Sequence, residues 1–380
     1  MLQAGPLELP SIPAGEKASI PLPLDAKRYG SQNEVYLTVT LTLKQATSWA
    51  PAGHQIAWFH HQLQGPSTKS LAATNALTSQ LSVSQEGSTV SVAGTGFDFT
   101  FDRARGALKT WTANGHALLE ADPTTGVAIS PSFWRPKTDN DVPISLPYWK
   151  RFGVDALTSQ LRSFKVDSSD SKKTVIKAHT FISPPVLDWG WNCEIEYTVH
   201  VTGALGINVA RLAPTGSFPE HVPRIGLNVY GNKGLEHVNW FGLGPGESYP
   251  DKKLSQRVGV WGVETVSELH THYDVPQENG NRMEARWLTL RDTKSPNIGL
   301  KATRLGTGEQ SHFSFVVSRH RDDTIQKAKH PHNLVEEDAT LFRLDYKVAG
   351  VGTAACGPGV RDDLLVKTEE VSFNFLIEPL

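Results

Sequence analysis

Apolar and polar residues alternate along several short stretches of this chain, a pattern typical of β-strands that bury one face. The clearest stretch is residues 34–43, EVYLTVTLTL, where the odd-numbered residues from Val35 to Leu43 share one face. Residues 53–63 predict a second strand, and residues 18–24 a further one. Three or four strands are too few for a complete sandwich. We therefore expect residues 1–65 to form a partial sandwich domain, truncated or completed by something outside this chain.

From residue 81 onward, short predicted strands recur with turn residues between them, and Phe97, Phe99 and Phe101 share a face of one of them. Helical candidates are limited to 146–161 and 322–329, where Asp322 or Asp323 is placed to cap the helix. This pattern predicts an all-β chain with a large antiparallel supersandwich at 81–380. The other expected strands are 89–92, 97–102, 174–181, 193–201, 207–212, 224–230, 285–290, 298–302, 312–318, 340–348 and 371–377.

The two predicted domains are separated by a stretch without periodicity. Residues 64–80 are small, polar and aperiodic, and we assign 66–80 as the linker. A total of 380 residues suits one large β domain and a smaller one.

The charge balance limits the possible partners of the protein, and the targeting signals limit its location. With 37 basic and 39 acidic residues, the net charge is −2, so we expect neither nucleic acid nor a membrane surface as partner. The sequence contains no apolar run of about 18 residues and no signal-peptide pattern at its start, which favours a cytoplasmic location. Cys193 and Cys356 are too few for a disulfide framework or a four-thiolate zinc site. We favour two buried free thiols, with pairing as the alternative.

The densest polar chemistry lies at 237–281. In VNWFGLGPGESYPD (238–251), glycines alternate beside aromatic residues and run into a turn that Gly and Pro favour. The polar candidates here are Tyr249, Asp251, Glu278, Asn279 and Arg282. They either buttress loops or form the rim of a ligand site. Paired carboxylates can supply an acid and a base, but this depends on their separation.

A second cluster is FWRPKTDND at 133–141. Trp134 offers a stacking face, while Arg135, Asp139 and Asn140 offer the hydrogen-bonding groups that suit a sugar. The same residues also fit a turn in which Asp and Asn cap backbone N–H groups and Arg135 pairs with a carboxylate.

A third cluster is rich in histidine. His330 and His332 flank a proline and lack the i, i+4 spacing of a helical zinc pair. We expect solvated loop histidines and no metal site, with metal binding on a strand-like segment as the alternative. His320 lies at a predicted strand end, where a general base can be placed, and Glu278 is its candidate partner. No nucleophile elbow or phosphate loop accompanies them, so the residues alone define no catalytic set.

Four segments resemble the C-terminal part of family 2 glycoside hydrolases, the large β-galactosidases. They are FWRPKTDND (133–141), VNWFGLGPGESYPD (238–251), VPQENGNR (275–282) and LDYKVAGVGTAACGPG (344–359). Residues 37–63 resemble the immunoglobulin-like domain that precedes this part. The resemblance covers nearly the whole chain and implies a partial immunoglobulin-like sandwich followed by a supersandwich similar to galactose mutarotase.

The resemblance also implies what lies elsewhere. In this family the catalytic glutamates and magnesium ligands sit on an upstream (β/α)8 barrel, and no barrel pattern occurs here. We therefore expect no cofactor in this chain, a galactoside-type sugar as ligand, and a catalytic large subunit or a homo-oligomer as partner. The family's sugar-contacting Trp corresponds, counting back from Asp345, to Leu341, which offers no π surface.

These expectations lead to one main functional prediction and two alternatives. The main prediction is a β-galactosidase small subunit or C-terminal component that contributes sugar binding, pocket rim and assembly without the catalytic barrel. One alternative is a stand-alone aldose 1-epimerase-type enzyme using His320 and Glu278. The other is a non-catalytic carbohydrate-binding protein, with candidate stacking faces at Trp134, Trp240, Tyr249 and Trp261.

Overall fold

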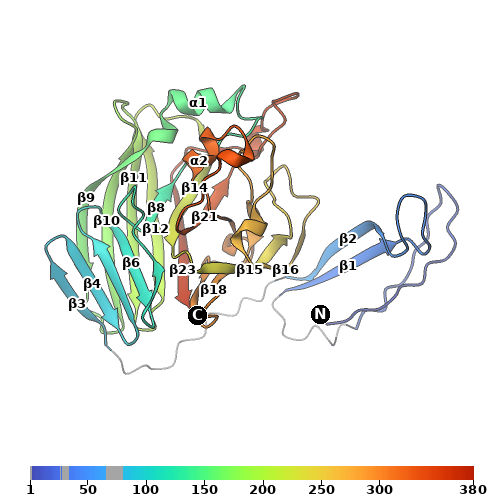
Figure 1. Ribbon diagram of the computed structural model, residues 1–380, viewed down its shortest axis with the longest axis horizontal. Coiled ribbons are helices and arrows are strands. Elements are labelled where there is room, and N and C mark those ends of the chain that lie inside the picture. The colour runs from blue at the N-terminus through green and yellow to red at the C-terminus, as the bar shows by residue number, and fades with distance from the viewer. Residues whose placement is uncertain (1, 26, 28–33, 66–79) are drawn as a thin grey trace. The chain divides into compact units, whose positions relative to one another are not determined.

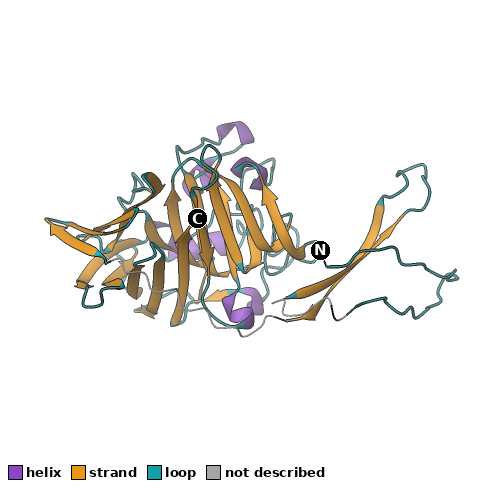
Figure 2. Cartoon of the chain, turned by 90° about the horizontal axis from the view of Figure 1, so that it is seen from below, coloured by secondary structure: helices purple, strands orange, loops and turns teal. Residues whose placement is uncertain are grey.

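The computed structural model describes residues 2–25, 27, 34–65 and 80–380, and the chain divides into two compact units, Met1–Ala72 and Ala73–Leu380. The division falls within the predicted linker, which lies outside the described residues except at Gln80. Strands dominate both units, and the helices are short (Figure 1, Figure 2). No helix in the described part of the chain is long and apolar enough to cross a membrane.

The first unit is built on one hairpin. Strand β1 (Val35–Thr42) pairs antiparallel with β2 (Gln55–Gln64), as the alternation predicts. The strand expected at 18–24 is wrong, because this segment is irregular in the structure. Pro21 and Pro23 have no N–H to donate to a strand ladder, which accounts for the difference.

The second unit contains two large sheets in which every described pair is antiparallel, confirming the predicted all-β class. The nine-stranded sheet has the order β16-β15-β18-β19-β23-β12-β11-β10-β9. Its strands are β9 (Thr158–Asp167), β10 (Lys173–Ser183), β11 (Gly190–His200), β12 (Leu205–Thr215), β15 (Leu235–Gly244), β16 (Arg257–Val263), β18 (Trp287–Asp292), β19 (Gly299–Thr303) and β23 (Val371–Pro379).

The ten-stranded sheet has the order β17-β20-β21-β14-β7-β6-β5-β4-β3, and β8 also pairs with β14. Its strands are β3 (Ser82–Glu86), β4 (Thr89–Gly94), β5 (Phe97–Asp102), β6 (Ala107–Ala113), β7 (His116–Leu119), β8 (Ile129–Ser132), β14 (Arg224–Gly231), β17 (Arg282–Ala285), β20 (Phe313–Ser318) and β21 (Thr340–Val348). A short pair, β13 (His221–Val222) and β22 (Val366–Lys367), lies outside both sheets.

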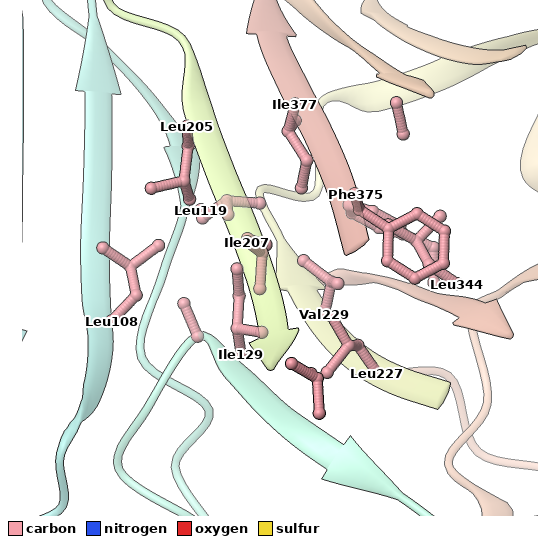
Figure 3. Packing of buried hydrophobic residues seen from close by; sticks show 14 of the residues in the cluster. Leu108, Leu119, Ile129, Leu205, Ile207, Leu227, Val229, Leu344, Phe375 and Ile377 are labelled. Atoms are coloured by element: carbon pink, nitrogen blue, oxygen red, sulfur yellow. The ribbon is translucent and has the colours of Figure 1, made fainter. Parts of the chain in front are cut away.

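The core lies between the two sheets. Leu205 and Ile207 from β12 and Phe375 from β23 face Leu227 and Val229 from β14 (Figure 3), and all five are buried. Phe97, Phe99 and Phe101 are buried on one face of β5, as expected. Face-to-face packing of two antiparallel sheets matches the expected large sandwich.

Both helical candidates contain a short helix. Helix α1 (Ser145–Arg151) lies at the start of the predicted range, and Gly153 at φ 63° lies between it and β9, whose first residue is Thr158. A glycine in the left-handed region commonly ends a helix, which accounts for the short length of α1. Helix α2 (Asp322–Lys327) has Arg321 at its N-cap with no side-chain cap, so the predicted Asp cap is wrong. Both aspartates lie in the first turn, where negative charge suits the helix dipole.

The cysteines are unpaired. Cys193 is buried and Cys356 is exposed, so the prediction of free thiols is confirmed but burial of Cys356 is wrong. Burial raises the pKa of Cys193 to about 12, which keeps this thiol protonated and unreactive.

The outer face of the ten-stranded sheet carries the polar chemistry. Along β14, Leu227 and Val229 point into the core, so Arg224, Asn228 and Tyr230 occupy the opposite face. On β21, Leu341 is in register with Tyr230 and Arg343 with Asn228, while Asp345 is in register with Gly226.

Candidate functional site

The four motif segments, although far apart in sequence, meet around one cavity of about 740 Å³, here called the motif cavity. The lining includes Asp139 and Asn140 from the first segment, Tyr249 and Asp251 from the second, and Glu278 from the third. Residues 351–361, which begin within the fourth segment, complete the wall. The structure thus brings together five residues that the sequence singled out.

Arg135 joins the first segment to the fourth. Its guanidinium is fully buried and contacts Asp141 through a two-point ion pair, with N–O distances of 2.8 and 3.2 Å. It also donates to the carbonyls of Ala349, at 3.1 Å, and Gly350, at 3.0 Å. A planar guanidinium paired at two points fixes both position and orientation. The turn interpretation of this segment therefore describes Arg135 better than a ligand-facing one.

Asp251 joins the second segment to the fourth. Its carboxylate accepts hydrogen bonds from the backbone N–H groups of Val351, at 2.9 Å, and Gly352, at 2.8 Å. Gly350 makes this approach possible, because a Cβ there would lie 2.5 Å from the Asp251 Oδ2 atom. The carboxylate holds the loop that forms one wall of the cavity.

Amide side chains complete the connections. Asn140 donates to the Gly352 carbonyl at 2.8 Å and accepts from the Ala355 N–H at 3.1 Å. The side-chain oxygen of Gln277 accepts from the Asp139 N–H at 3.1 Å. Through these bonds the first segment is tied to both the third and the fourth.

Glu278 belongs to a buried ionic network. It lies 2.6 Å from the Arg224 guanidinium and 3.6 Å from that of Arg343, and it accepts a long 3.5 Å bond from the Tyr249 hydroxyl. Asp345 contacts Arg224 at 3.1 Å. Burial raises the pKa of Asp345 to about 6, against the lowering effect of both arginines. Carboxylates held in this way are committed to structural ion pairs.

Glu247 is the second buried carboxylate at this site. It accepts bonds from Lys252 and Tyr273 and, at 2.8 Å, from the Gly280 N–H. Burial alone would raise the pKa of Glu247, but the bonds from Lys252, Tyr273 and Gly280 hold it below its usual range. Glu247 was not among the residues predicted from the sequence, although its place within GESYPD (246–251) was a usable signal.

Asn279 and Arg282 shape the third segment. Asn279 accepts from the Thr271 N–H at 3.1 Å, and Arg282 donates to the carbonyls of Leu269, at 2.9 Å, and Gly280, at 2.6 Å. Burial lowers the pKa of Arg282 to about 10. Both side chains stabilise loop backbone, which is the buttressing interpretation.

The outer edge of the motif cavity is partly apolar. Val142 and Ile144, which follow the first segment, are 45% and 56% exposed. Ile144 lies beside Gly359, since a Cβ on that glycine would be 3.5 Å from the Ile144 Cδ1 atom. Exposed Asp139 and Cys356 belong to the same surface, here called the motif face. Neither Val142 nor Ile144 was a sequence candidate, because single exposed apolar residues carry no periodic signal.

The remaining candidates lie elsewhere. His320 lines a small cavity of about 120 Å³, where its ring lies 5.5 Å from that of His270. Glu278 lines the motif cavity instead, so the two groups proposed as an acid–base pair face different cavities. Trp134 and Leu341 line a third cavity of about 670 Å³.

The candidate stacking faces differ in exposure. Trp240 and Tyr249 are each 1% exposed, which leaves neither ring open to a ligand. Trp261 is half-buried, with its indole N–H close to the carbonyls of Gly242 and Arg257. Trp134 remains half-buried and faces a cavity. Among the described residues, no group of three or more His, Cys, Asp or Glu side chains is placed to hold a metal ion.

These observations define the class of protein: an all-β chain with a supersandwich and a cavity lined by the four motif segments. A family model described as the beta galactosidase small chain matches residues 93–377, and one described as beta-galactosidase, domain 4, matches residues 1–64. The chain belongs to the beta-galactosidase small-chain family.

Curated relatives support this membership. The beta-galactosidase of Kluyveromyces lactis is 28% identical over 371 residues, covering 97% of this chain and 33% of the relative. The Vibrio cholerae beta-galactosidase is 29% identical, covering 84% of this chain and 30% of the relative. The chain thus spans about a third of the length of the curated relatives it matches.

Solved structures with some likeness include a galactose mutarotase-like protein from Lactobacillus casei, at 9% identity and a TM-score of 0.41, covering 77% of this chain and all of that one. Another is galactose 1-epimerase from Lactobacillus acidophilus, at 10% identity and a TM-score of 0.41, covering 80% and 99%.

Proposed function

We propose that this chain is the component of a β-galactosidase that forms part of the pocket rim and holds the assembly together, with the motif face against a catalytic chain. The family membership supports a role within a β-galactosidase. The arrangement of the motif cavity, a rigid buried scaffold beneath an exposed rim, supports a contact surface.

The observation that carries the proposal is the contrast between the two layers of the site. Beneath the rim, Arg135, Asp251 and Glu278 hold four distant segments through buried or backbone-directed bonds. At the rim, Val142 and Ile144 are exposed beside polar loop residues. Exposed apolar side chains with polar residues around them suit a protein–protein interface.

The chemistry of the carboxylates agrees with this assignment. Glu278 and Asp345 share buried arginines, and Glu247 is held by Lys252 and a tyrosine, so all three already have structural partners. A hydrolytic pair requires carboxylates that face the same substrate. Our proposal therefore places the catalytic carboxylates, and any magnesium, in the partner chain.

The hairpin of the first unit supplies a second reason to expect a partner. Phe59 and Leu41, on the two strands, are 56% and 38% exposed. A two-stranded hairpin is marginally stable alone, and additional strands normally cover such a face. We propose that the partner chain completes this sandwich. The two unpaired cysteines fit a reducing compartment such as the cytoplasm.

Association can be measured directly. The Kluyveromyces lactis relative, with the third that matches this chain removed, serves as the catalytic chain. Light scattering of the mixture should show a complex of the two chains, as it should when the relative's own third is added back. Ile144→Asp should weaken association at least tenfold, because it puts a charge into the apolar rim.

Val186→Asp is the matched control, since Val186 is fully exposed in the loop between β10 and β11 and does not line the motif cavity. It should leave association unchanged. The proposal fails if the relative's own third binds and this chain does not, or if both aspartate variants bind like the wild type.

A further inference from the structure

Three histidines meet around the small cavity of about 120 Å³, here called the histidine cavity. His270 follows the short helix η3 (Val266–Leu269), and His272 and His320 line the same space. The centroid of the His270 ring lies 5.1 Å from that of His272 and 5.5 Å from that of His320. Sites for organic molecules usually exceed about 300 Å³, so the histidine cavity suits a single small inorganic ion.

Two buried arginines extend the basic lining of the histidine cavity. Arg319, directly after β20, is 4% exposed, and Arg343 on β21 is 8% exposed. The Nε atom of Arg343 is buried and has no hydrogen-bond partner among the described residues. Buried N–H donors are nearly always hydrogen-bonded, so an acceptor held within the cavity that Arg343 lines would satisfy this one.

Carboxylates outside the cavity wall already balance the two arginines. The ion pairs are Arg319 with Glu236, and Arg343 with Asp322 and Glu278. The wall itself contains one acidic side chain, the exposed Glu336. Among the lining residues, further positive charge can therefore come only from the three histidines, so the cavity attracts an anion when these rings are protonated.

Protonation of these histidines requires a counter-charge. Burial, together with the nearby His320 and His272, lowers the pKa of His270 to about 4, against the opposing effect of Glu247. An anion between the rings would offset both the burial and the mutual repulsion, because an opposite charge nearby favours the protonated form. Anion binding and proton uptake are therefore coupled, and each strengthens the other.

The hydrogen bond of His320 shows how this ring would take up a proton. Its Nδ1 atom lies 3.0 Å from the carbonyl oxygen of Val335. Because a carbonyl only accepts, Nδ1 carries the proton of the neutral ring. Protonation then occurs at Nε2, which changes this nitrogen from an acceptor into a donor. The ring can thus gain a charge and a donor while its bond to Val335 stays in place.

We propose that the histidine cavity binds a small inorganic oxyanion, of the sulfate or phosphate type, together with protons taken up by its histidines. His270, His272, His320 and the Nε–H group of Arg343 are the donors. Among the residues that the structure describes, none lines both this cavity and the motif cavity. The proposal therefore stands or falls independently of the role assigned to the motif face.

Isothermal titration calorimetry of the whole chain with sodium sulfate tests this site, at pH 5.5 and pH 7.5 and at constant ionic strength. Sulfate is the probe because its charge is the same at both pH values. It should bind at least tenfold more tightly at pH 5.5, with a heat that depends on the buffer because binding takes up protons. Inorganic phosphate should compete with sulfate, since the two share the tetrahedral oxyanion that the site recognises.

His270→Gln and His272→Gln should each weaken sulfate binding at pH 5.5 at least fivefold. His272 is exposed, so its variant tests the charge without disturbing the fold. His116→Gln is the control, because His116 is an exposed histidine on β7 that does not line the histidine cavity, and it should leave binding unchanged. The proposal is overturned if sulfate does not bind at pH 5.5, if it binds equally at both pH values, or if His272→Gln binds like the wild type.

Discussion

Arg224 shows at the scale of one residue how the motif segments are held. Its guanidinium is completely buried, with Glu278 at 2.6 Å and Asp345 at 3.1 Å. Removing one partner of a buried ion pair leaves an uncompensated charge in a low-dielectric interior. The stability of the segment 275–282 therefore depends on Glu278.

Glu278→Gln should lower the free energy of unfolding by about 3 kcal/mol, the cost of breaking a buried pair. Urea titration followed by tryptophan fluorescence gives this value. Asp363→Asn is the matched control, because Asp363 forms an exposed pair with Arg361, and it should change stability by less than about 0.5 kcal/mol. Equal stability of the two variants would contradict a structural role for Glu278.

His270 gives the chain a pH-dependent stability term. Burial, together with the nearby His320 and His272, lowers its pKa to about 4, while Glu247 opposes this shift. The unfolded chain therefore takes up a proton here that the folded chain does not, and stability falls as the pH drops from about 6.5 to 4. Asp345, with its pKa raised to about 6, acts in the opposite direction below pH 6.

A variant at His270 separates its effect on stability from that of Asp345. Between pH 7 and pH 5, His270→Gln should lose about 1 kcal/mol less stability than the wild type, allowing for solvent screening of a half-buried ring. Urea unfolding at both pH values measures the difference. Identical pH dependence in the two proteins would show that His270 does not titrate as the structure indicates.

At the scale of elements, the alternation of apolar and polar residues predicts a strand where one face of that strand is apolar. The strands with strong alternation, such as β1 and β5, appear where expected. Strands β8 and β9 were missed because β8 contains Pro131 and β9 is a largely exposed edge strand, so neither shows a clear apolar face. The predicted site residues on the four motifs do meet. Their bonding partners, however, are distant in the sequence: Arg135, for example, donates to the carbonyl of Gly350, 215 residues away. Such pairings have no local signal.

The loop after β21 provides a test at this scale. Gly350→Ala would place a Cβ 2.5 Å from the Asp251 carboxylate, which must move from its bonds to the Val351 and Gly352 N–H groups. We expect a loss of about 1 to 3 kcal/mol in stability, the usual cost of overpacking, and faster proteolysis at 351–359. Gly5→Ala, where no heavy atom lies within 4 Å, is the control. Unchanged cleavage of the loop would argue against Asp251 as its anchor.

At the scale of the whole molecule, two units each leave a surface that suits a partner. The hairpin exposes Phe59, and the motif face exposes Ile144 above a buried ionic scaffold. The chain spans about a third of the curated β-galactosidases it matches, and its motif carboxylates are engaged in structural bonds. These observations support the proposal of a component that acts through a catalytic chain.

The most direct test of the central claim is restored hydrolysis of a chromogenic β-galactoside. The Kluyveromyces lactis relative without its matching third is mixed with this chain, with its own third as the positive control. If the motif face binds the catalytic chain, hydrolysis should rise well above that of either chain alone, and it should fall at least tenfold with Ile144→Asp but not with Val186→Asp. Hydrolysis restored by the relative's own third and not by this chain, or equally by both variants, would contradict it.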